Sequence, residues 1–533
     1  MERDLIIGID AGTSVIKAVA FDLQGRQIAM ASTPNQVLYG PGGVAEQDMD
    51  RTWSDTAATL RALGERVPNL TARAVALAAT GQGDGTWLVD ADGRPVGPAL
   101  LWLDARSSTQ VQALRQQSAG KAIAARTGNA LTPSMQSGQL LWLRENQPER
   151  LSRAATAMHC KDWLFFKATG VRATSPCEGI YTFGNFKTLA YDEEVLDLLG
   201  LASLKRLLPP VVDGTRQHAP LSREAAAQTG LREGLPVVLP LMDVPLSILG
   251  AGGLSYDPQG ALRRVGCSVL GSTGMHGWVS GDIDAIVPSA ESGYTIAMPQ
   301  PGLRVRLVSH MAATLNIDWL LNLLNGAAEL AGAKPLSRAH LLERLDELVL
   351  STAPAQAIYL PYIAESGERG PFVDASARAQ LGGFSAGLGV AGLSRAVYEG
   401  IALATRDCYL ALGDLPDEIR LSGGAARSPA FRQLLASVTG RPVRVSHREE
   451  CGAAGAAITA AVAVGSHADV RATLVHWVEP YLDPVVTEPD ARESALYEPI
   501  YRHYRDMTQQ ARAPWRALAE TRLAHAKAPL QED

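Results

Sequence analysis

A short segment near the N-terminus concentrates small and polar residues between two apolar, β-branched runs at residues 5–9 and 15–21. The set consists of Asp10, Gly12, Thr13, Ser14 and Lys17. A glycine in such a link lets the backbone approach a ligand, and successive turn N–H groups can bind an anion. Hydroxyl and ammonium groups add donors, and a carboxylate is a ligand that Mg²⁺ accepts beside phosphate oxygens. The residues alone give equal weight to a metal–phosphate site and to an ordinary buried β-hairpin.

A single carboxylate, Asp243, follows an otherwise apolar segment. Residues 236–240 read as a buried strand and lead into Leu-Met-Asp-Val. Burying a carboxylate is costly unless the group has partners or a task, so Asp243 is a candidate functional residue.

Two polar loops follow predicted strands in the first half of the chain. The first, Gly-Gln82-Gly83-Asp84-Gly, comes directly after a strand at residues 74–79 and suggests contact with a small ligand. Asp104 follows a second predicted strand, at residues 99–103, where open α/β sheets bind ligands. On its own, Asp104 is better explained by a surface ion pair with Arg106.

The second half of the chain repeats the opening pattern. A strand predicted at residues 261–265 is followed by a small Gly/Ser/Thr turn, and a glycine pair later separates another strand from a helix. The repeat predicts a duplicated α/β architecture with a ligand between the halves. A glycine pair before a helix N-terminus favours a flat ring or an anion. These turns contain Gly271, Ser272, Thr273, Gly423, Gly424, Ala425 and Ser428.

Length and composition limit the classes of function. A chain of 533 residues with 46% hydrophobic and 20% charged residues is globular and needs two or more domains. A net charge of −6 and the lack of a basic, aromatic-rich cluster argue against nucleic-acid binding. Five scattered cysteines, no signal-like N-terminus and only a short apolar run at residues 453–465 predict a soluble cytoplasmic protein without membrane contact.

The order of these motifs resembles the FGGY family of carbohydrate kinases, within the actin-like sugar kinase superfamily. The matching segments read GIDAGTSVIKAVAFD, GQGDG, LWLDAR, LGSTG, GERGP, RAVYEG and LSGGAARSPAFRQLLASVTGRPV, together with Asp243. They extend from residue 5 to about residue 465 in the family's order. The resemblance implies an α/β fold of two actin-like (ribonuclease H-like) domains with a ligand cleft between them. We expect a first domain at residues 1–254, a second at 255–466 and a helical extension at 467–533.

The resemblance also implies roles for the residues named above. Asp243 corresponds to the general base, and Asp10 would hold Mg²⁺. ATP would contact Gly12, Thr13, Ser14 and Lys17 from the first domain, and Gly271, Ser272, Thr273, Gly423, Gly424, Ala425 and Ser428 from the second. A small polyol or sugar would contact Gln82, Gly83, Asp84 and Asp104. A homodimer is left open.

Departures from the family pattern concern the substrate. Glycerol kinases carry Arg-Glu and xylulose kinases Met-His where this chain has Gly83-Asp84, and Val244 stands where many members have Asn or Gln. The segments TGQGDGTWLVD, HCKDWL and GSTGMH are most similar in sequence to those of family members that act on erythritol, a four-carbon polyol. The alternatives are a pentulose or pentitol such as xylulose or xylitol and, in another class, an actin-like ATPase acting as a chaperone or regulator.

Overall fold

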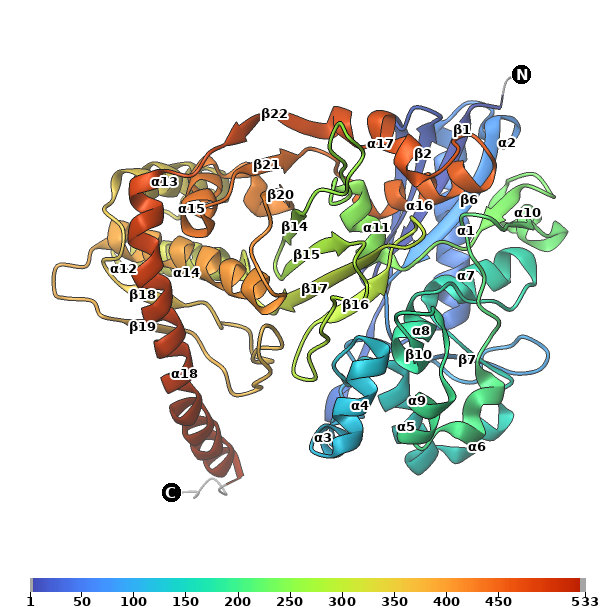
Figure 1. The fold of residues 1–533 in the computed structure, drawn as a ribbon, viewed down its shortest axis with the longest axis horizontal. Coiled ribbons are helices and arrows are strands. Elements are labelled where there is room, and N and C mark those ends of the chain that lie inside the picture. The colour runs from blue at the N-terminus through green and yellow to red at the C-terminus, as the bar shows by residue number, and fades with distance from the viewer. Residues whose placement is uncertain (1–2, 528–533) are drawn as a thin grey trace.

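The computed structural model describes residues 3–527, which form two domains that each contain a mixed β-sheet flanked by helices (Figure 1). The first sheet has the order β12-β13-β6-β1-β2-β3. Its strands are β1 (Leu5–Ala11), β2 (Val15–Asp22), β3 (Gln27–Pro34), β6 (Ala74–Gly81), β12 (Ala219–Pro220) and β13 (Pro236–Val238).

The second sheet has the order β16-β17-β15-β14-β20-β21-β22. Its strands are β14 (Val265–Leu270), β15 (Gly274–Ser280), β16 (Tyr294–Ala297), β17 (Arg304–His310), β20 (Glu418–Ser422), β21 (Val443–Ser446) and β22 (Leu482–Thr487).

The two sheets share one topology. In each, an antiparallel hairpin (β1–β2 or β14–β15) is extended by a third antiparallel strand, and the hairpin's first strand pairs in parallel with β6 or β20. A further parallel strand and an antiparallel edge strand follow in both. This confirms the predicted duplicated α/β fold and the N-terminal hairpin, in which Asp10 lies opposite Lys17.

Helices cover the sheets and form the outer part of each domain. Those before the second sheet are α1 (Met49–Arg66), α2 (Leu70–Arg73), α3 (Ser108–Arg115), α4 (Ser118–Thr127), α5 (Gln136–Asn146), α6 (Pro148–Arg153), α7 (Cys160–Thr169), α8 (Glu178–Phe183), α9 (Glu193–Leu198), α10 (Arg223–Thr229) and α11 (Asp243–Gly250). The later ones are α12 (Leu315–Leu330), α13 (Arg338–Ser351), α14 (Val390–Ala411), α15 (Pro429–Thr439), α16 (Cys451–Ala463), α17 (Val470–Trp477) and α18 (Ala491–Lys527). No helix within residues 3–527 is long and apolar enough to cross a membrane.

Short strand pairs complete the secondary structure. They are β4 (Leu38–Gly40), β5 (Val44–Gln47) and β8 (Ala99–Leu100) in one small sheet, β7 (Trp87–Val89) with β9 (Thr156–Met158), β10 (Gly184–Asn185) with β11 (Ala190–Tyr191), and β18 (Ile358–Leu360) with β19 (Gln380–Gly382).

Two strand positions differ from the expectation. The strand expected at 261–265 begins only at Val265, because the residues before it form a turn closed by a bridge between Tyr256 and Leu262. The strand expected at 99–103 ends at Leu100. The chain turns there because Ala45 hydrogen-bonds to Leu101 and Asp104, through its backbone oxygen and N–H respectively.

Two small-residue helices, α11 and α16, pack closely where the domains meet. A Cβ on Gly250 or Gly455 would lie 2.3 Å from a backbone oxygen of the other helix, so only glycine permits this approach. Although α16 belongs to the second half of the sequence, it also packs on β1 and β6 of the first sheet. The sequence boundaries at 254 and 466 stay a prediction, and spatially the first domain includes α16.

The C-terminal segment packs on both domains. It supplies the edge strand β22 and the helix α18 to the second domain. The helix α17 instead packs on α16, and its Trp477 contacts Phe21 of β2 in the first domain.

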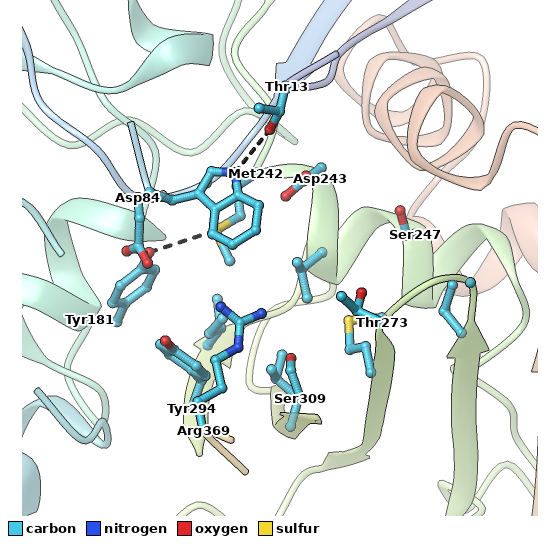
Figure 2. A pocket seen from close by; sticks show the side chains of 18 residues that line it. Thr13, Asp84, Tyr181, Met242, Asp243, Ser247, Thr273, Tyr294, Ser309 and Arg369 are labelled. Carbon is cyan, nitrogen blue, oxygen red and sulfur yellow. Dashed lines mark hydrogen bonds between the residues drawn. The ribbon is translucent and has the colours of Figure 1, made fainter. Parts of the chain in front are cut away.

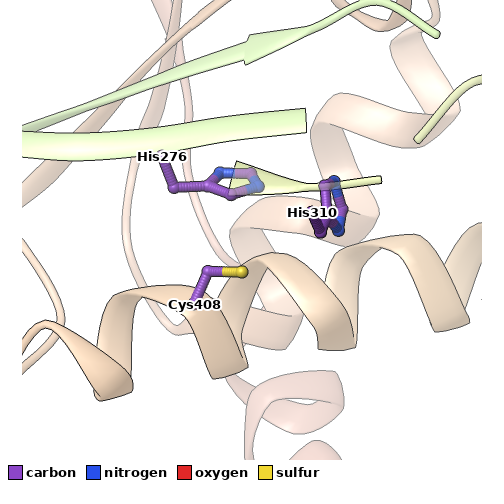
Figure 3. A group of neighbouring side chains, drawn as sticks. All are labelled: His276, His310 and Cys408. Carbon is purple, nitrogen blue, oxygen red and sulfur yellow. The ribbon is translucent and has the colours of Figure 1, made fainter. Parts of the chain in front are cut away.

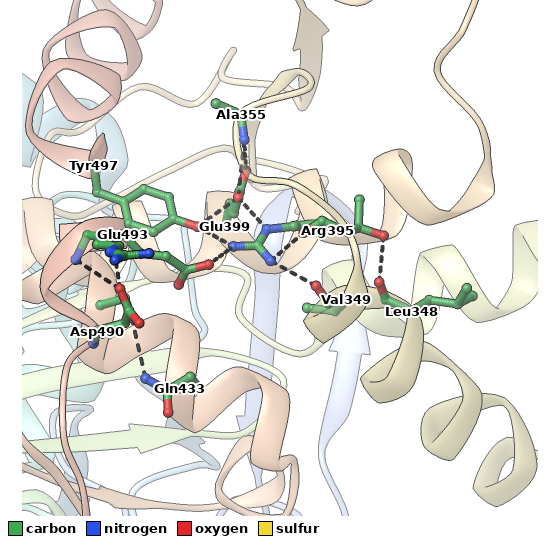
Figure 4. A network of polar contacts seen from close by, with 12 residues as sticks. Leu348, Val349, Ala355, Arg395, Glu399, Gln433, Asp490, Glu493 and Tyr497 are labelled. Atoms are coloured by element: carbon green, nitrogen blue, oxygen red, sulfur yellow. Dashed lines mark hydrogen bonds and ion pairs between the residues drawn. The ribbon is translucent and has the colours of Figure 1, made fainter. Parts of the chain in front are cut away.

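A buried network fixes α18: Arg395 donates to Glu399 (2.9 Å), Glu493 (2.6 Å) and Tyr497 (3.1 Å) (Figure 4). Tyr497, Tyr501 and Tyr504 recur at helical spacing and are all buried, so this face of α18 docks on the second domain.

Candidate active site

A cavity of about 360 Å³ lies between the two domains, as the duplicated sequence pattern predicts (Figure 2). The first domain contributes Thr13, Gly83, Asp84, Trp102, Tyr181, Met242 and Asp243 to its wall, and the second contributes Gly271, Thr273, Tyr294, Ser309 and Arg369. The cavity therefore brings together Thr13 of the first predicted phosphate loop, Gly271 and Thr273 of the second, the predicted general base and part of the predicted polyol site.

Asp243 is the first residue of α11 and lies on the cavity wall. Its Oδ1 atom is buried and has no hydrogen-bond partner among the described residues. Burial, reinforced by the nearby carboxylates Asp10 and Glu178, holds the pKa of Asp243 well above its ordinary value. An unpartnered carboxyl oxygen of raised basicity, facing a cavity, is suited to take a proton from a bound hydroxyl group.

Asp84 is fixed in orientation by two hydroxyl donors. Ser134 donates to Oδ2 at 2.6 Å, and the Tyr181 hydroxyl donates to Oδ1. Burial raises the pKa of Asp84 despite these bonds. The preceding Gly83 leaves no room for a side chain, because a Cβ would lie 2.4 Å from the sulfur of Met242. This end of the cavity therefore presents one short, oriented carboxylate.

Gln82 lies behind the cavity wall. Trp102 donates to the Thr13 hydroxyl (2.9 Å), which donates to the Gln82 side-chain oxygen (3.1 Å), and the Gln82 amide donates to Gln47 (2.7 Å). Gln82 is 2% exposed and is not among the lining residues. In this structure it positions Thr13 and Trp102, and a direct contact with a polyol stays a prediction.

Asp104 is also outside the cavity wall. Its carboxylate accepts from the Ala45 N–H (3.0 Å) and from Arg106 (3.0 Å), which also pairs with Glu46 at 2.6 Å. The pair with Arg106 exists, but it is buried rather than on the surface. Asp104 thus fixes the turn that carries Trp102.

The predicted metal–phosphate segment contains a charged cluster. Lys17 forms an ion pair of 2.9 Å with Glu450, the residue before α16, and so is engaged by the protein itself. Burial raises the pKa of Asp10 to about 6, and Glu450 adds to the rise while Lys17 opposes it. A Cβ on Gly452 would lie 2.5 Å from the Asp10 carboxylate, so glycine keeps space beside that group.

The remaining predicted phosphate residues lie in the two hairpin turns. The Gly12 carbonyl accepts from the Asn35 side chain at 2.9 Å, and Gly271 donates to the Thr273 carbonyl at 3.0 Å. Ser14 and Ser272 are exposed.

A second cavity, of about 570 Å³, lies within the second domain and is lined by Gly424, Ala425 and Ser428. Ser428 caps α15 by accepting from the Phe431 N–H (3.0 Å), and it donates to Asp346 at 2.6 Å. Gly423 lines a neighbouring cavity of about 670 Å³ that also includes Glu450. The residues predicted to bind adenosine therefore line neighbouring cavities.

Sequence reasoning missed several lining residues. Trp102 and Arg369 stood inside quoted motifs, LWLDAR and GERGP, but received no role. Tyr181, Tyr294 and Ser309 belong to no motif, and only the packing of α8, β16 and β17 brings them to the cavity.

A separate polar group lies in the core of the second domain (Figure 3). It consists of His276 on β15, His310 on β17 and Cys408 on α14, whose nitrogen and sulfur atoms lie within 4.8 Å of one another. Burial lowers the pKa of both histidines, to about 4 for His310. His276 Nδ1 is 2.9 Å from the Ser268 hydroxyl. None of the three histidine and cysteine side chains lines the interdomain cavity.

Comparison with known proteins agrees with this geometry. The model of the FGGY family of carbohydrate kinases matches residues 5–250 as the N-terminal domain and 267–464 as the C-terminal domain. The chain is 46% identical over 518 residues to the erythritol kinase of Brucella abortus, covering 97% of this chain and 98% of that one. It is 29% identical to the xylulose kinase of Escherichia coli, over 95% and 99% of the two chains.

Solved structures have the same fold over nearly the whole length. The ligand-bound xylulose kinase from Lactobacillus acidophilus has a TM-score of 0.85 at 22% identity, with 96% of this chain and 99% of that chain covered. The xylulose kinase from Rhodospirillum rubrum has a TM-score of 0.84 at 25% identity, with 96% and 100% covered. This chain belongs to the FGGY family of carbohydrate kinases, enzymes that transfer phosphate from ATP to a sugar or polyol.

Proposed function

We propose that this kinase phosphorylates a terminal hydroxyl of erythritol, with Asp243 as the general base. The observation that carries the proposal is the interdomain cavity. Asp243, whose carboxyl oxygen has no partner, lines this cavity together with Thr13, Thr273 and the oriented Asp84. The identity of 46% to an erythritol kinase over nearly the full length supports the choice of polyol.

The residues divide the reaction into binding, positioning and proton transfer. Gly12–Ser14 and Gly271–Thr273 would hold the β- and γ-phosphates from the two domains, and Gly423–Ser428 would hold the adenosine. Asp243 accepts the proton of the attacking hydroxyl as the new P–O bond forms. Closure of the domains excludes water, which would otherwise compete as the phosphoryl acceptor.

Asp10 is the residue we propose for Mg²⁺. Its carboxylate is buried, its pKa is raised to about 6, and Gly452 leaves space beside it. Burial disfavours the charged form of this carboxylate, so a bound cation would stabilise it, and few carboxylates plus phosphate oxygens suit Mg²⁺. Bound there, Mg²⁺ would neutralise charge on the phosphate oxygens.

The polyol end of the cavity favours a short, neutral substrate. Met242 closes the space beside Gly83, and the oriented Asp84 carboxylate can accept hydrogen bonds from hydroxyl groups. Ile296 and Leu307 add apolar wall that suits carbon–hydrogen faces. A five-carbon substrate is the second candidate, because xylulose kinases are also similar over almost the whole chain.

A panel of acceptors tests the proposal. ADP release is measured with erythritol, glycerol, xylitol, ribitol, D-xylulose and L-xylulose at saturating Mg²⁺–ATP. We expect the highest kcat/KM for erythritol. A higher value for a five-carbon ketose would replace the substrate but keep the kinase assignment.

A further inference from the structure

Arg369 reaches the interdomain cavity from the second domain without a charged partner. It lines the cavity and is half-buried. Across residues 3–527, its guanidinium group makes no hydrogen bond or ion pair with the protein, and its Nε atom is buried without a partner. A buried arginine donor without an acceptor is unfavourable, so a ligand acceptor is the natural complement.

The backbone that carries Arg369 is firmly held. The buried Glu368 carboxylate accepts from the backbone N–H groups of Met311 (2.9 Å), Arg369 (2.8 Å) and Gly370 (3.2 Å). Gly370 lies so close to β17 that a Cβ would be 2.4 Å from the Ser309 carbonyl oxygen. The loop therefore presents Arg369 from a fixed base against the strand β17.

The guanidinium group lies beside the Asp84 end of the cavity. Its central carbon is 5.4 Å from the ring centroid of Trp102, a residue of the first domain. Tyr294 lines the same cavity as Asp84 and Arg369. Burial and Asp84 raise the pKa of its phenol, while Arg369 opposes the rise. Figure 2 shows Asp84, Tyr294 and Arg369 on one side of the cavity, with Asp243 and Thr273 on the other.

We propose that Arg369 is the second domain's substrate-binding residue and donates hydrogen bonds to polyol hydroxyls opposite Asp84. This rests on the proposed polyol kinase function. Asp84 and Arg369 form no ion pair with each other, so a ligand can join them. Their opposite charges favour a neutral polyol over a sugar acid, because the Asp84 carboxylate would repel a second carboxylate at this end.

A substrate held in this way contacts both domains. Asp84 belongs to the first domain and Arg369 to the second, so the bound polyol favours the arrangement in which the two approach each other. Arg369 thereby links recognition of the hydroxyl groups to closure over ATP.

The test compares Arg369→Met with wild type on erythritol and on glycerol. Methionine keeps an unbranched, apolar side chain but loses every donor. Loss of a charged hydrogen bond corresponds to about a 10- to 100-fold rise in KM for erythritol. Glycerol, which is one hydroxyl shorter, should change by less than about 3-fold, and KM for ATP should be unchanged. Arg344→Met, at an exposed site on α13, is the matched control.

Further measurements keep the test decisive. Arg369→Lys retains the charge but not the planar pair of donors, and should give an intermediate KM. Binding of erythritol measured by calorimetry without ATP should weaken in the same order. An unchanged KM for erythritol, an equal loss for glycerol, a rise only in KM for ATP, or preferred phosphorylation of the four-carbon sugar acid would overturn the proposal.

The panel of acceptors measured with wild type tests the proposed substrate independently of the Arg369 variants. If wild type prefers another acceptor, the same variants are measured on that acceptor and its one-carbon-shorter analogue. Arg369 then keeps its role only if the longer acceptor alone is affected.

Discussion

At the scale of single residues, Asp243 is expected to carry the proton transfer. Asp243→Asn keeps the size of the side chain but removes its basicity, so kcat should fall about 10²- to 10⁴-fold. ATP affinity should stay within about 2-fold, because the carboxyl group is proposed to act on the acceptor. Steady-state kinetics and nucleotide titration measure both quantities. Asp92→Asn, an exposed change in the same domain, is the control; near-wild-type turnover in Asp243→Asn would exclude the base role.

Asp10 should make the protein's stability depend on pH in an unusual direction. Its folded-state pKa is about 6, above the ordinary 3.8, so the folded state binds a proton more readily than the unfolded state. Stability from this group is therefore present below pH 4 and is lost as pH rises to about 6. Asp10→Asn should raise the free energy of unfolding at pH 8 by about 1–3 kcal/mol, with little gain at pH 4.

Asp10→Asn should also weaken the stabilisation of the protein by Mg²⁺–ATP. Mg²⁺–ATP should raise the melting temperature of wild type at pH 8 and have a smaller effect on Asp10→Asn. An equal shift in both proteins would contradict a metal role for Asp10.

At the scale of elements, the contact between α11 and α16 sets the position of Asp243. Gly455→Ala places a Cβ 2.3 Å from the Leu246 carbonyl oxygen, which forces the helices apart and should destabilise the protein by about 1–3 kcal/mol. Because Asp243 begins α11, kcat should fall as well. Gly64→Ala is the matched control: it lies in α1 with no atom in the way and should stabilise by about 0.5–1 kcal/mol. Urea unfolding and kinetics distinguish the two.

The Arg395 network should affect stability without affecting catalysis. Arg395→Met leaves the Glu399 carboxylate buried without its ion-pair partner, which should cost about 3–5 kcal/mol in urea unfolding. Replacing both residues by apolar side chains should recover most of the loss. The KM for each substrate should be unchanged in folded protein, since neither residue lines the interdomain cavity.

At the scale of the whole molecule, acid should lower the free energy of unfolding, because histidines that are neutral and buried in the folded state take up protons on unfolding. His310 has a folded pKa of about 4, below the ordinary 6.5, so the unfolded chain binds a proton first. Its contribution is full above pH 6.5 and is lost as pH falls towards 4, by up to about 3 kcal/mol. Chemical unfolding at pH 7, 5.5 and 4.5 measures this loss. The difference in stability between wild type and His310→Gln should shrink with falling pH; a constant difference would show that His310 does not titrate in this range.

Local sequence patterns were sufficient for much of the fold. The two short apolar runs flanking the turn at residues 10–14, and the similar arrangement around Gly271, predicted the two hairpins and hence the duplicated sheets, because run length and turn chemistry act over a few residues. The helical spacing of Tyr497, Tyr501 and Tyr504 is likewise a local pattern that indicates one buried helix face. The strand expected at 261–265 starts at Val265 instead, because Leu262 pairs with Tyr256 across a turn and pairing with β20 begins only at Val265.

The sequence by itself determined the duplicated α/β architecture, the family and the lone carboxylate Asp243, because strand periodicity, turn residues and the order of motifs are carried along the chain. Only the tertiary structure decided which polar residues face the cavity. Long-range partners within the first domain hold Gln82 and Asp104 behind the wall. The place of Arg369 in the cavity depends on how the two domains pack against each other. Contacts between segments hundreds of residues apart, such as Lys17 with Glu450, arise only when the whole chain is folded.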